Sequence, residues 1–172
     1  KKYTSKILYN KTGKGSALIK GFASSKGDIV VSMDADLSHR PEELNLLINV
    51  IRCGYDICMG SRFLEGGKST DISIMRKAGN YFFVKLINLL YESNYTDICY
   101  GYRSFSRKAL KKLNLNEKGF GIETEISIKA KKYNLKILEI PSFERKRYKG
   151  NGKLRTIHDG YIILKTILKN IN

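Results

Sequence analysis

The apolar run from Asp28 to Met33 is the feature that most constrains the fold of this chain. A short run rich in β-branched residues is typical of a strand that is buried on both faces, as in the centre of an α/β sheet. An amphipathic helix is predicted from Pro41 to Arg52, and a second apolar run extends from Asp56 to Gly60. This alternation of strand, helix and strand predicts a parallel sheet with crossover helices.

The remaining pattern extends the α/β alternation in both directions. An apparent edge segment spans 5–9, and apolar residues at three- and four-residue steps predict helices at 17–25, 75–90, 107–113 and 123–133. Residues 97–106 are predicted to be extended or a turn, and 135–140 to be a strand. The last apolar stripe lies on a basic helix and consists of Ile157, Tyr161, Leu164, Leu168 and Ile171.

The composition is that of one soluble globular domain, because 42% of the 172 residues are hydrophobic and 28% are charged. The net charge of +16 points to polyanionic partners such as nucleic acid, anionic lipid or phosphorylated substrates. A solvated lysine-rich surface accounts for the same excess. The charge therefore narrows the class of partner without selecting one.

Three cysteines without Cys-x-x-Cys spacing support neither a disulfide framework nor a zinc site, so reduced, cytoplasm-facing thiols are expected. The apolar stretches 81–91 and 161–168 are short and interrupted by polar residues, so neither spans a bilayer as it stands. The chain opens on Lys1 and Lys2 without a signal peptide. We expect it to be a fragment.

Two carboxylates, Asp34 and Asp36, stand where the first apolar run ends. Ligands of open α/β sheets bind beyond the carboxyl ends of the strands. Hard oxygen ligands at that point suit Mg²⁺ or Mn²⁺, which in turn hold the phosphates of a nucleotide. The same residues also fit a turn or an N-cap before the helix that begins at Pro41, and spacing alone does not decide between the two.

Glycines around Lys14 match neither the Walker pattern nor the dinucleotide pattern, because Gly15 and Leu18 occupy required positions. What remains is a glycine turn with a lysine at a helix start, either a contact for a phosphate or sugar edge or an ordinary turn. Arg62 follows the second strand, so the same edge of the sheet brings it near the acids, where its guanidinium could hold a diphosphate. Alone, such an arginine is also compatible with simple exposure.

Two further groups of charged residues invite a functional interpretation. Glu123 and Glu125 follow a glycine-rich turn; they are either favourable charges in a first helical turn or site carboxylates. The basic loop from Glu144 to Lys153 is either a solvated loop, a nucleic-acid contact, or a clamp for a second phosphate. The histidines, His39 and His158, are interpreted as structural or surface residues.

In their order along the chain, these motifs resemble family 2 glycosyltransferases with the GT-A fold, in the branch of dolichyl-phosphate mannosyltransferase and polyprenyl-phosphate glycosyltransferases. The resemblance covers nearly the whole chain, and the residues that carry it are Gly13 to Gly15, Ala17, Gly21, Gly27, Asp28, Met33 to Leu37, Pro41, Glu42, Gly60 to Arg62, Arg76, Asn80, Asp97, Gly101 to Arg103, Phe120, Glu123 to Glu125, Glu139 to Pro141, Arg147, Gly150 and Lys153. Similar proteins tend to have Gly-x-Ser-Lys or Gly-x-Ser-Asn where this chain has Gly-Asn-Gly-Lys, so a possible hydroxyl contact is missing.

The resemblance implies a Rossmann-like α/β fold with a mostly parallel central sheet in three α/β/α layers. It also implies that the chain lacks the family's first strand-helix-strand unit, which recognises the nucleotide base. A catalytic domain at 1–154 and an amphipathic helix at 155–172, packed on or next to it, are expected.

The implied activity is metal-dependent, inverting transfer of a hexose from GDP-mannose or UDP-glucose to a polyprenyl or dolichyl phosphate, at the cytoplasmic face of a membrane. The implied site comprises Asp34 and Asp36 for Mg²⁺ or Mn²⁺, Arg62, Arg103, Arg147 and Lys153 for phosphates, Glu123 and Glu125 for the sugar or acceptor, and Lys14 and Gly15 beside the donor.

Two alternatives remain. A family 2 transferase that acts on a polysaccharide or another hydroxyl acceptor would need a carboxylate base. A basic nucleic-acid-binding module would explain the charge, but it gives no reason for acids at strand ends, so nucleic acid is not expected as a partner.

Overall fold

A four-stranded sheet in the order β1-β4-β2-β5 forms the centre of the protein in this computed structural model, which describes residues 5–148 and 156–171. Its strands are β1 (Ile29–Ser32), β2 (Ile57–Ser61), β4 (Arg103–Ser106) and β5 (Ile137–Pro141). A smaller sheet pairs β3 (Lys68–Ser69) with β6 (Phe143–Glu144). The three apolar runs of the sequence are confirmed as β1, β2 and β5.

Strand direction was predicted only in part. β1 and β2 both pair antiparallel with β4, and β5 pairs parallel with β2, so β1, β2 and β5 run the same way. The sheet is therefore mixed, and β4 separates the two strands that the sequence pattern joins by a crossover. Because three strands share a direction, their carboxyl ends still meet at one edge of the sheet.

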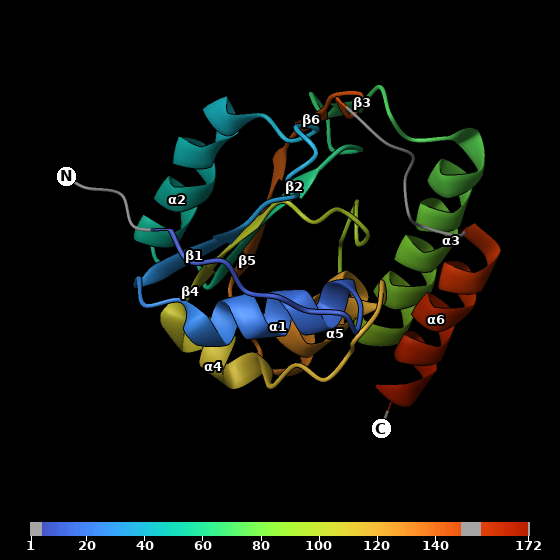
Figure 1. Cartoon of the computed structure of the whole chain (residues 1–172). Helices are drawn as coiled ribbons and strands as arrows, with labels where there is room; N and C mark the ends of the chain where they lie inside the picture. The colour runs from blue at the N-terminus through green and yellow to red at the C-terminus, as the bar shows by residue number, and fades with distance from the viewer. Residues whose placement is uncertain (1–4, 149–155, 172) are drawn as a thin grey trace.

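The helices agree closely with the sequence pattern (Figure 1). They are α1 (Lys14–Ser24), the 3₁₀ helix η1 (Pro41–Glu43), α2 (Leu44–Arg52), α3 (Ile74–Tyr91), α4 (Arg107–Leu113), α5 (Ile122–Lys132) and α6 (Thr156–Lys169). Serine caps begin two of them: the Ser73 hydroxyl accepts from the Arg76 N–H, and the Ser106 hydroxyl from the Ala109 N–H. Proline in the first turn begins η1.

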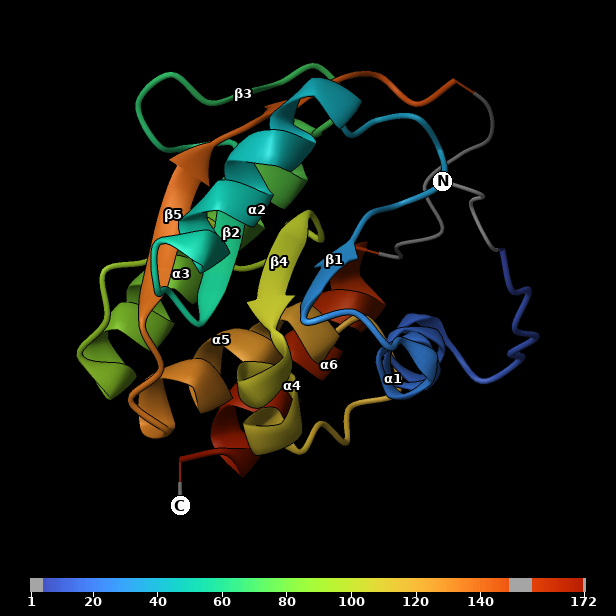
Figure 2. The ribbon, with the colours of Figure 1, turned by 90° about the vertical axis from the view of Figure 1, so that its left-hand side faces the viewer.

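Helices cover both faces of the sheet, as Figures 1 and 2 show: α2 lies on one face, and α1, α4 and α5 lie on the other. β2 explains this arrangement, because its five residues are all buried. Ile57 and Met59 join the larger apolar cluster, with residues of α3, α5 and α6, whereas Cys58 joins Leu47 and Tyr102 on the α2 face. The three-layer expectation is confirmed.

Two terminal expectations have different outcomes. Residues 5–9 form no strand, and Ile7 and Tyr9 are exposed, so the expected edge segment is wrong. The predicted C-terminal helix is confirmed as α6, which packs against α3 and α5. The predicted stripe is not the packed face, because Ile157, Tyr161 and Leu168 are exposed, whereas Ile163 and Ile167 join the larger apolar cluster. The proposed boundary at residues 154 and 155 lies outside the described part of the chain.

Candidate functional site

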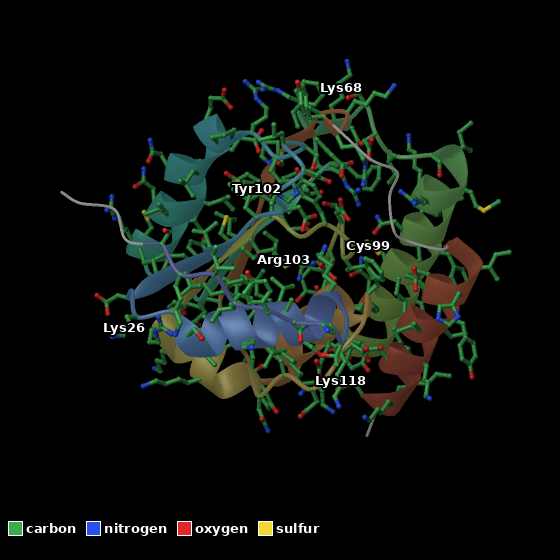
Figure 3. The ribbon with its side chains drawn as sticks, viewed as in Figure 1. Lys26, Lys68, Cys99, Tyr102, Arg103 and Lys118 are labelled. Carbon is green, nitrogen blue, oxygen red and sulfur yellow. The ribbon has the colours of Figure 1, made fainter. Side chains whose placement is uncertain are left out.

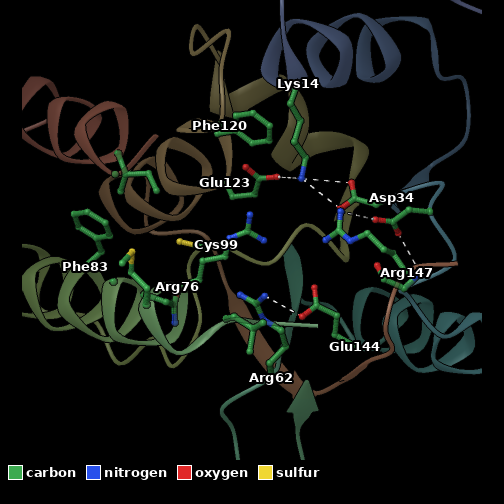
Figure 4. A pocket seen from close by; sticks show the side chains of 18 residues that line it. Lys14, Asp34, Arg62, Arg76, Phe83, Cys99, Phe120, Glu123, Glu144 and Arg147 are labelled. Atoms are coloured by element: carbon green, nitrogen blue, oxygen red, sulfur yellow. Dashed lines mark hydrogen bonds and ion pairs between the residues drawn. The ribbon is translucent and has the colours of Figure 1, made fainter. Parts of the chain in front are cut away.

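A pocket of about 180 Å³ opens at the sheet edge where β1, β2 and β5 end (Figure 4). Charged side chains from several segments line one part of it, and apolar residues of α3 and α6 line the other. The charged lining residues are Lys14, Asp34, Asp36, Arg62, Arg76, Glu123, Glu144 and Arg147. The apolar part includes Ile72, Met75, Phe83, Phe120 and Ile163. The pocket therefore joins a polar, strongly charged region to an apolar one.

The acidic turn, Asp34 to Leu37, begins one residue after the end of β1 and presents both carboxylates at the pocket. Its backbone is unusual, since Leu37 has a φ of 64°. The Ser38 N–H donates to Asp36 Oδ1 at 3.1 Å, and the Tyr148 N–H donates to the Asp36 carbonyl at 3.1 Å. Partial burial raises the pKa of Asp36, but the Ser38 bonds and the Arg147 charge outweigh it and hold the pKa below its ordinary value.

Lys14 bridges two acids across the pocket, as the dashed lines in Figure 4 show. Its ammonium lies 2.7 Å from Glu123 Oε1 and 3.4 Å from Asp34 Oδ1. Burial lowers the pKa of Lys14, but the two carboxylates outweigh it and raise the pKa above its ordinary value, so the lysine is charged. Gly101 leaves room for this cluster, because a Cβ there would lie 3.2 Å from Lys14 Nζ.

Gly15 has a structural position rather than the predicted contact with substrate. It is buried, and a Cβ at this residue would lie 2.1 Å from the Glu117 carbonyl oxygen. The N–H groups of Gly15 and Ser16 donate to the carbonyls of Gly119 and Lys118. The start of α1 is therefore docked on the 117–119 segment, and those N–H groups are not directed at a phosphate.

Arg62 is fixed by two buried acids. Its Nε donates to Asp97 Oδ2 at 2.7 Å and its Nη2 to Asp97 Oδ1 at 3.1 Å, which is a bidentate pair. Its Nη1 donates to Glu144 Oε2 at 3.2 Å, and its guanidinium lies over the Tyr100 ring at 4.8 Å. Burial lowers the pKa of Arg62, but Asp97 and Glu144 outweigh it and raise the pKa.

Arg147 reaches the pocket from the segment after β6 and pairs with two acids. It donates to Asp71, and its Nη1 lies 3.6 Å from Asp36 Oδ2. The hydrogen bond from Arg147 holds the pKa of Asp71 below its ordinary value. Each carboxylate of the acidic turn is thus accompanied by a cation, Lys14 for Asp34 and Arg147 for Asp36.

Besides Gly15, two further predicted residues do not reach the pocket, and both are corrections. Arg103 is 1% exposed and donates to the carbonyls of Tyr100, Ile98 and Glu123. Figure 3 places it in the interior, whereas Lys26, Lys68 and Lys118 lie at the periphery. Arg103 is the first residue of a strand between two others, so its side chain meets backbone carbonyls instead of a ligand.

Glu125 is the second of these residues. Its carboxylate accepts from the N–H groups of Asn116 and Glu117 and pairs with Lys129 Nζ at 2.8 Å. It therefore orders the segment before α5, while Glu123, two positions away on the helix, faces the pocket. Lys153 lies outside the described residues.

Sequence reasoning missed several residues that shape the site. Asp71 and Glu144 pair with pocket arginines, and no local pattern marks either one. Asp97 carried part of the family resemblance but had no assigned role. His39, interpreted as a structural or surface residue, is buried beside the acidic turn, and its Nδ1 accepts from the Asp34 N–H at 3.1 Å.

The donor set fits a divalent cation of the Mg²⁺ type. Asp34 and Asp36 supply two carboxylates, with side chains 41% and 28% exposed. Within 5–148 and 156–171, no group of three or more His, Cys, Asp or Glu side chains could hold a metal ion. That is compatible with Mg²⁺, which is commonly bound through one or two carboxylates while waters and substrate phosphates complete the shell.

No helix in the described ranges combines the length and apolar character that crossing a membrane requires.

Comparison with known proteins agrees with this geometry. The model of the family "Glycosyl transferase family 2" matches residues 5–114. A dolichol-phosphate mannosyltransferase from Pyrococcus furiosus is 37% identical over 90% of this chain and 44% of its own length. An undecaprenyl-phosphate mannosyltransferase from Micrococcus luteus is 32% identical over 84% of this chain and 61% of its own. The chain thus spans about half the length of these curated relatives.

Among solved structures, glucosyl-3-phosphoglycerate synthase from Mycobacterium tuberculosis, in complex with Mn²⁺, UDP and phosphoglyceric acid, has a TM-score of 0.73 and 19% identity. The match covers 96% of this chain and 56% of that one, which confirms the GT-A fold. The sequence comparisons confirm the expected family, and the structural likeness confirms the expected fold. This chain belongs to glycosyl transferase family 2.

Proposed function

We propose that the protein containing this chain transfers a hexose from a nucleotide-diphosphate sugar to a polyprenyl phosphate, with a divalent cation and with inversion at the anomeric carbon. The observation that carries the proposal is the two-part pocket. Carboxylates and arginines that are half-buried or buried line one part, and apolar residues of α3 and α6 line the other. A substrate that joins a phosphate to a hydrocarbon chain matches both parts.

The charged part suits the donor. Asp34 and Asp36 would hold the cation, which when bound would neutralise charge on the leaving diphosphate. Lys14 and Arg147 already lie at these carboxylates and would contact diphosphate oxygens once the cation takes the acids. Glu123 lies against Lys14 and would orient the lysine and the sugar.

The acceptor needs little activation. A phosphate monoester has a second pKa near ~6, so its attacking oxygen is already anionic at neutral pH. Arg62 supports this step because it is held rigidly: the bonds described above use three of its five N–H groups, which leaves others for a ligand. Preorganised charge of this kind needs no rearrangement during the reaction.

A membrane surface is the proposed setting, at its cytoplasmic face. α3 and α6 lie side by side (Figure 1) and carry exposed apolar residues, including Ile74, Phe82, Ile157, Tyr161 and Leu168. The net charge of +16 would favour an anionic leaflet. This arrangement would bring a lipid acceptor to the apolar part of the pocket.

The test is a transfer assay on the full-length protein that crosses GDP-mannose and UDP-glucose with a polyprenyl phosphate and with hydroxyl acceptors. Asp36→Asn should lower Mg²⁺-dependent transfer by at least about 100-fold, because one of the two carboxylate ligands loses its charge. Glu42→Gln, an exposed acid outside the pocket, is the matched control. Unchanged transfer by Asp36→Asn, or transfer to hydroxyl acceptors alone, would contradict the proposal.

A further inference from the structure

The acidic turn requires support from outside itself. Leu37 has a φ of 64° and is 64% exposed, so no burial of its side chain compensates for the left-handed backbone. This conformation is unfavourable for any residue that carries a Cβ. A turn under that strain keeps two carboxylates in one arrangement only if neighbouring groups hold its backbone.

His39 contacts this turn at its first residue. Its Nδ1 lies 3.1 Å from the Asp34 backbone nitrogen, and because that N–H can only donate, Nδ1 must accept. The ring proton is therefore on Nε2, which lies 3.9 Å from Asp34 Oδ2. One imidazole thus faces both the backbone and the carboxylate of the same aspartate.

The His39 ring is itself held in place. It stacks on Tyr102 with ring centroids 4.8 Å apart and 7° between the planes, and it meets the edge of Tyr100 at 4.8 Å. Only 1% of its side chain is exposed. The Tyr102 hydroxyl donates to the Arg40 carbonyl at 3.0 Å, which ties the stack to the backbone beyond the turn. The imidazole cannot turn its Nδ1 away without disturbing this packing.

We propose that His39 is a positioning residue for the divalent-cation site: its Nδ1 fixes the Asp34 backbone so that the strained turn presents both carboxylates in binding geometry. This inference rests on the proposed function, because it assumes that Asp34 and Asp36 bind a cation. His39 itself touches neither substrate nor cation. Its effect is on the affinity of the site.

The experiment measures Mn²⁺ binding to the full-length protein by electron paramagnetic resonance of the free ion, with GDP and with UDP. His39→Leu removes the acceptor, whereas His39→Asn, of similar shape, keeps an oxygen that can accept from the Asp34 N–H. Loss of a group that hydrogen-bonds to a metal ligand typically weakens metal binding by about 10- to 100-fold. We expect that loss for His39→Leu and recovery of most of the affinity in His39→Asn.

The Mn²⁺ measurements separate the role of His39 from the proposed function. Equal binding by wild type and His39→Leu overturns the inference and leaves the proposed function intact, and equally weak binding by both variants overturns the role of the hydrogen bond. If the wild type binds no Mn²⁺ with either nucleotide, the metal-dependent function and the inference both fail.

A second measurement does not depend on the folding of any variant. In the wild-type protein, ¹⁵N chemical shifts of the imidazole report which ring nitrogen carries the proton. A proton on Nε2 alone supports the inference. A proton on Nδ1 overturns it, because Nδ1 could then no longer accept from the Asp34 N–H.

Discussion

Arg62 and Arg147 line the same pocket, but their surroundings differ. The side chains of Arg62 and Asp97 are 8% and 0% exposed, whereas those of Arg147 and Asp71 are 22% and 13% exposed. Arg62 follows β2 and Asp97 lies in the segment before β4, whereas Asp71 and Arg147 lie in the segments that follow β3 and β6. Arg62 therefore contributes a fixed charge to the pocket, and Arg147 a charge that can be redirected.

Asp97→Asn should have the largest effect. It leaves the buried Arg62 with half of its charge compensation, and breaking a buried pair costs about 3–5 kcal/mol. Urea denaturation of the chain would measure this loss in the free energy of unfolding. The double variant Arg62→Met/Asp97→Asn should lose less than the sum of the two single variants. A loss for Asp97→Asn below about 1 kcal/mol would show that Arg62 is not held as rigidly as described.

The position of Lys14 depends on how α1 is docked, because its neighbour Gly15 packs against the backbone of the 117–119 segment. Gly15→Ala places a Cβ 2.1 Å from the Glu117 carbonyl oxygen, and the forced shift should cost about 1–3 kcal/mol. Gly21→Ala is the matched control in the same helix, since a Cβ there meets nothing within 4 Å. That control should gain roughly 0.5–1 kcal/mol. Thermal melting of both variants measures the contrast, and shifts of the same sign would refute it.

Asp71→Asn should have the smallest effect on stability, about 0.2–1 kcal/mol, because its ion pair with Arg147 reaches solvent. The pKa of Asp71 lies below its ordinary value of 3.8 in the folded state. Its contribution is therefore complete above that ordinary value and is lost as the pH falls through the folded-state pKa.

Denaturation of wild type and Asp71→Asn should be measured from neutral pH down through the folded-state pKa of Asp71. The difference in the free energy of unfolding should be constant at neutral pH and should disappear in acid. A difference that grows as the pH falls would reverse the assigned direction. Together with Asp97→Asn, this measurement determines whether the two arginines are held as differently as their burial indicates.

Local patterns predicted the elements of the fold because each depends on residues close in sequence. The runs that became β1, β2 and β5 and the helical spacing of α3 needed no tertiary information. The acidic pair was located at the correct edge of the sheet because a strand end and a crevice are linked by topology. The direction of β4 could not be predicted from the sequence, since nothing within Arg103 to Ser106 indicates that this strand runs antiparallel to its neighbours.

The sequence by itself determined the α/β class, the family and the position of Asp34 and Asp36 at a strand end. Only the tertiary structure decided which charges face the pocket. Glu123 and Glu125 look alike in sequence, yet one meets Lys14 and the other meets Asn116, Glu117 and Lys129. The role of a charged side chain is set by the groups that replace water around it, and these come from distant segments, as with Arg62 and Glu144, which are 82 residues apart.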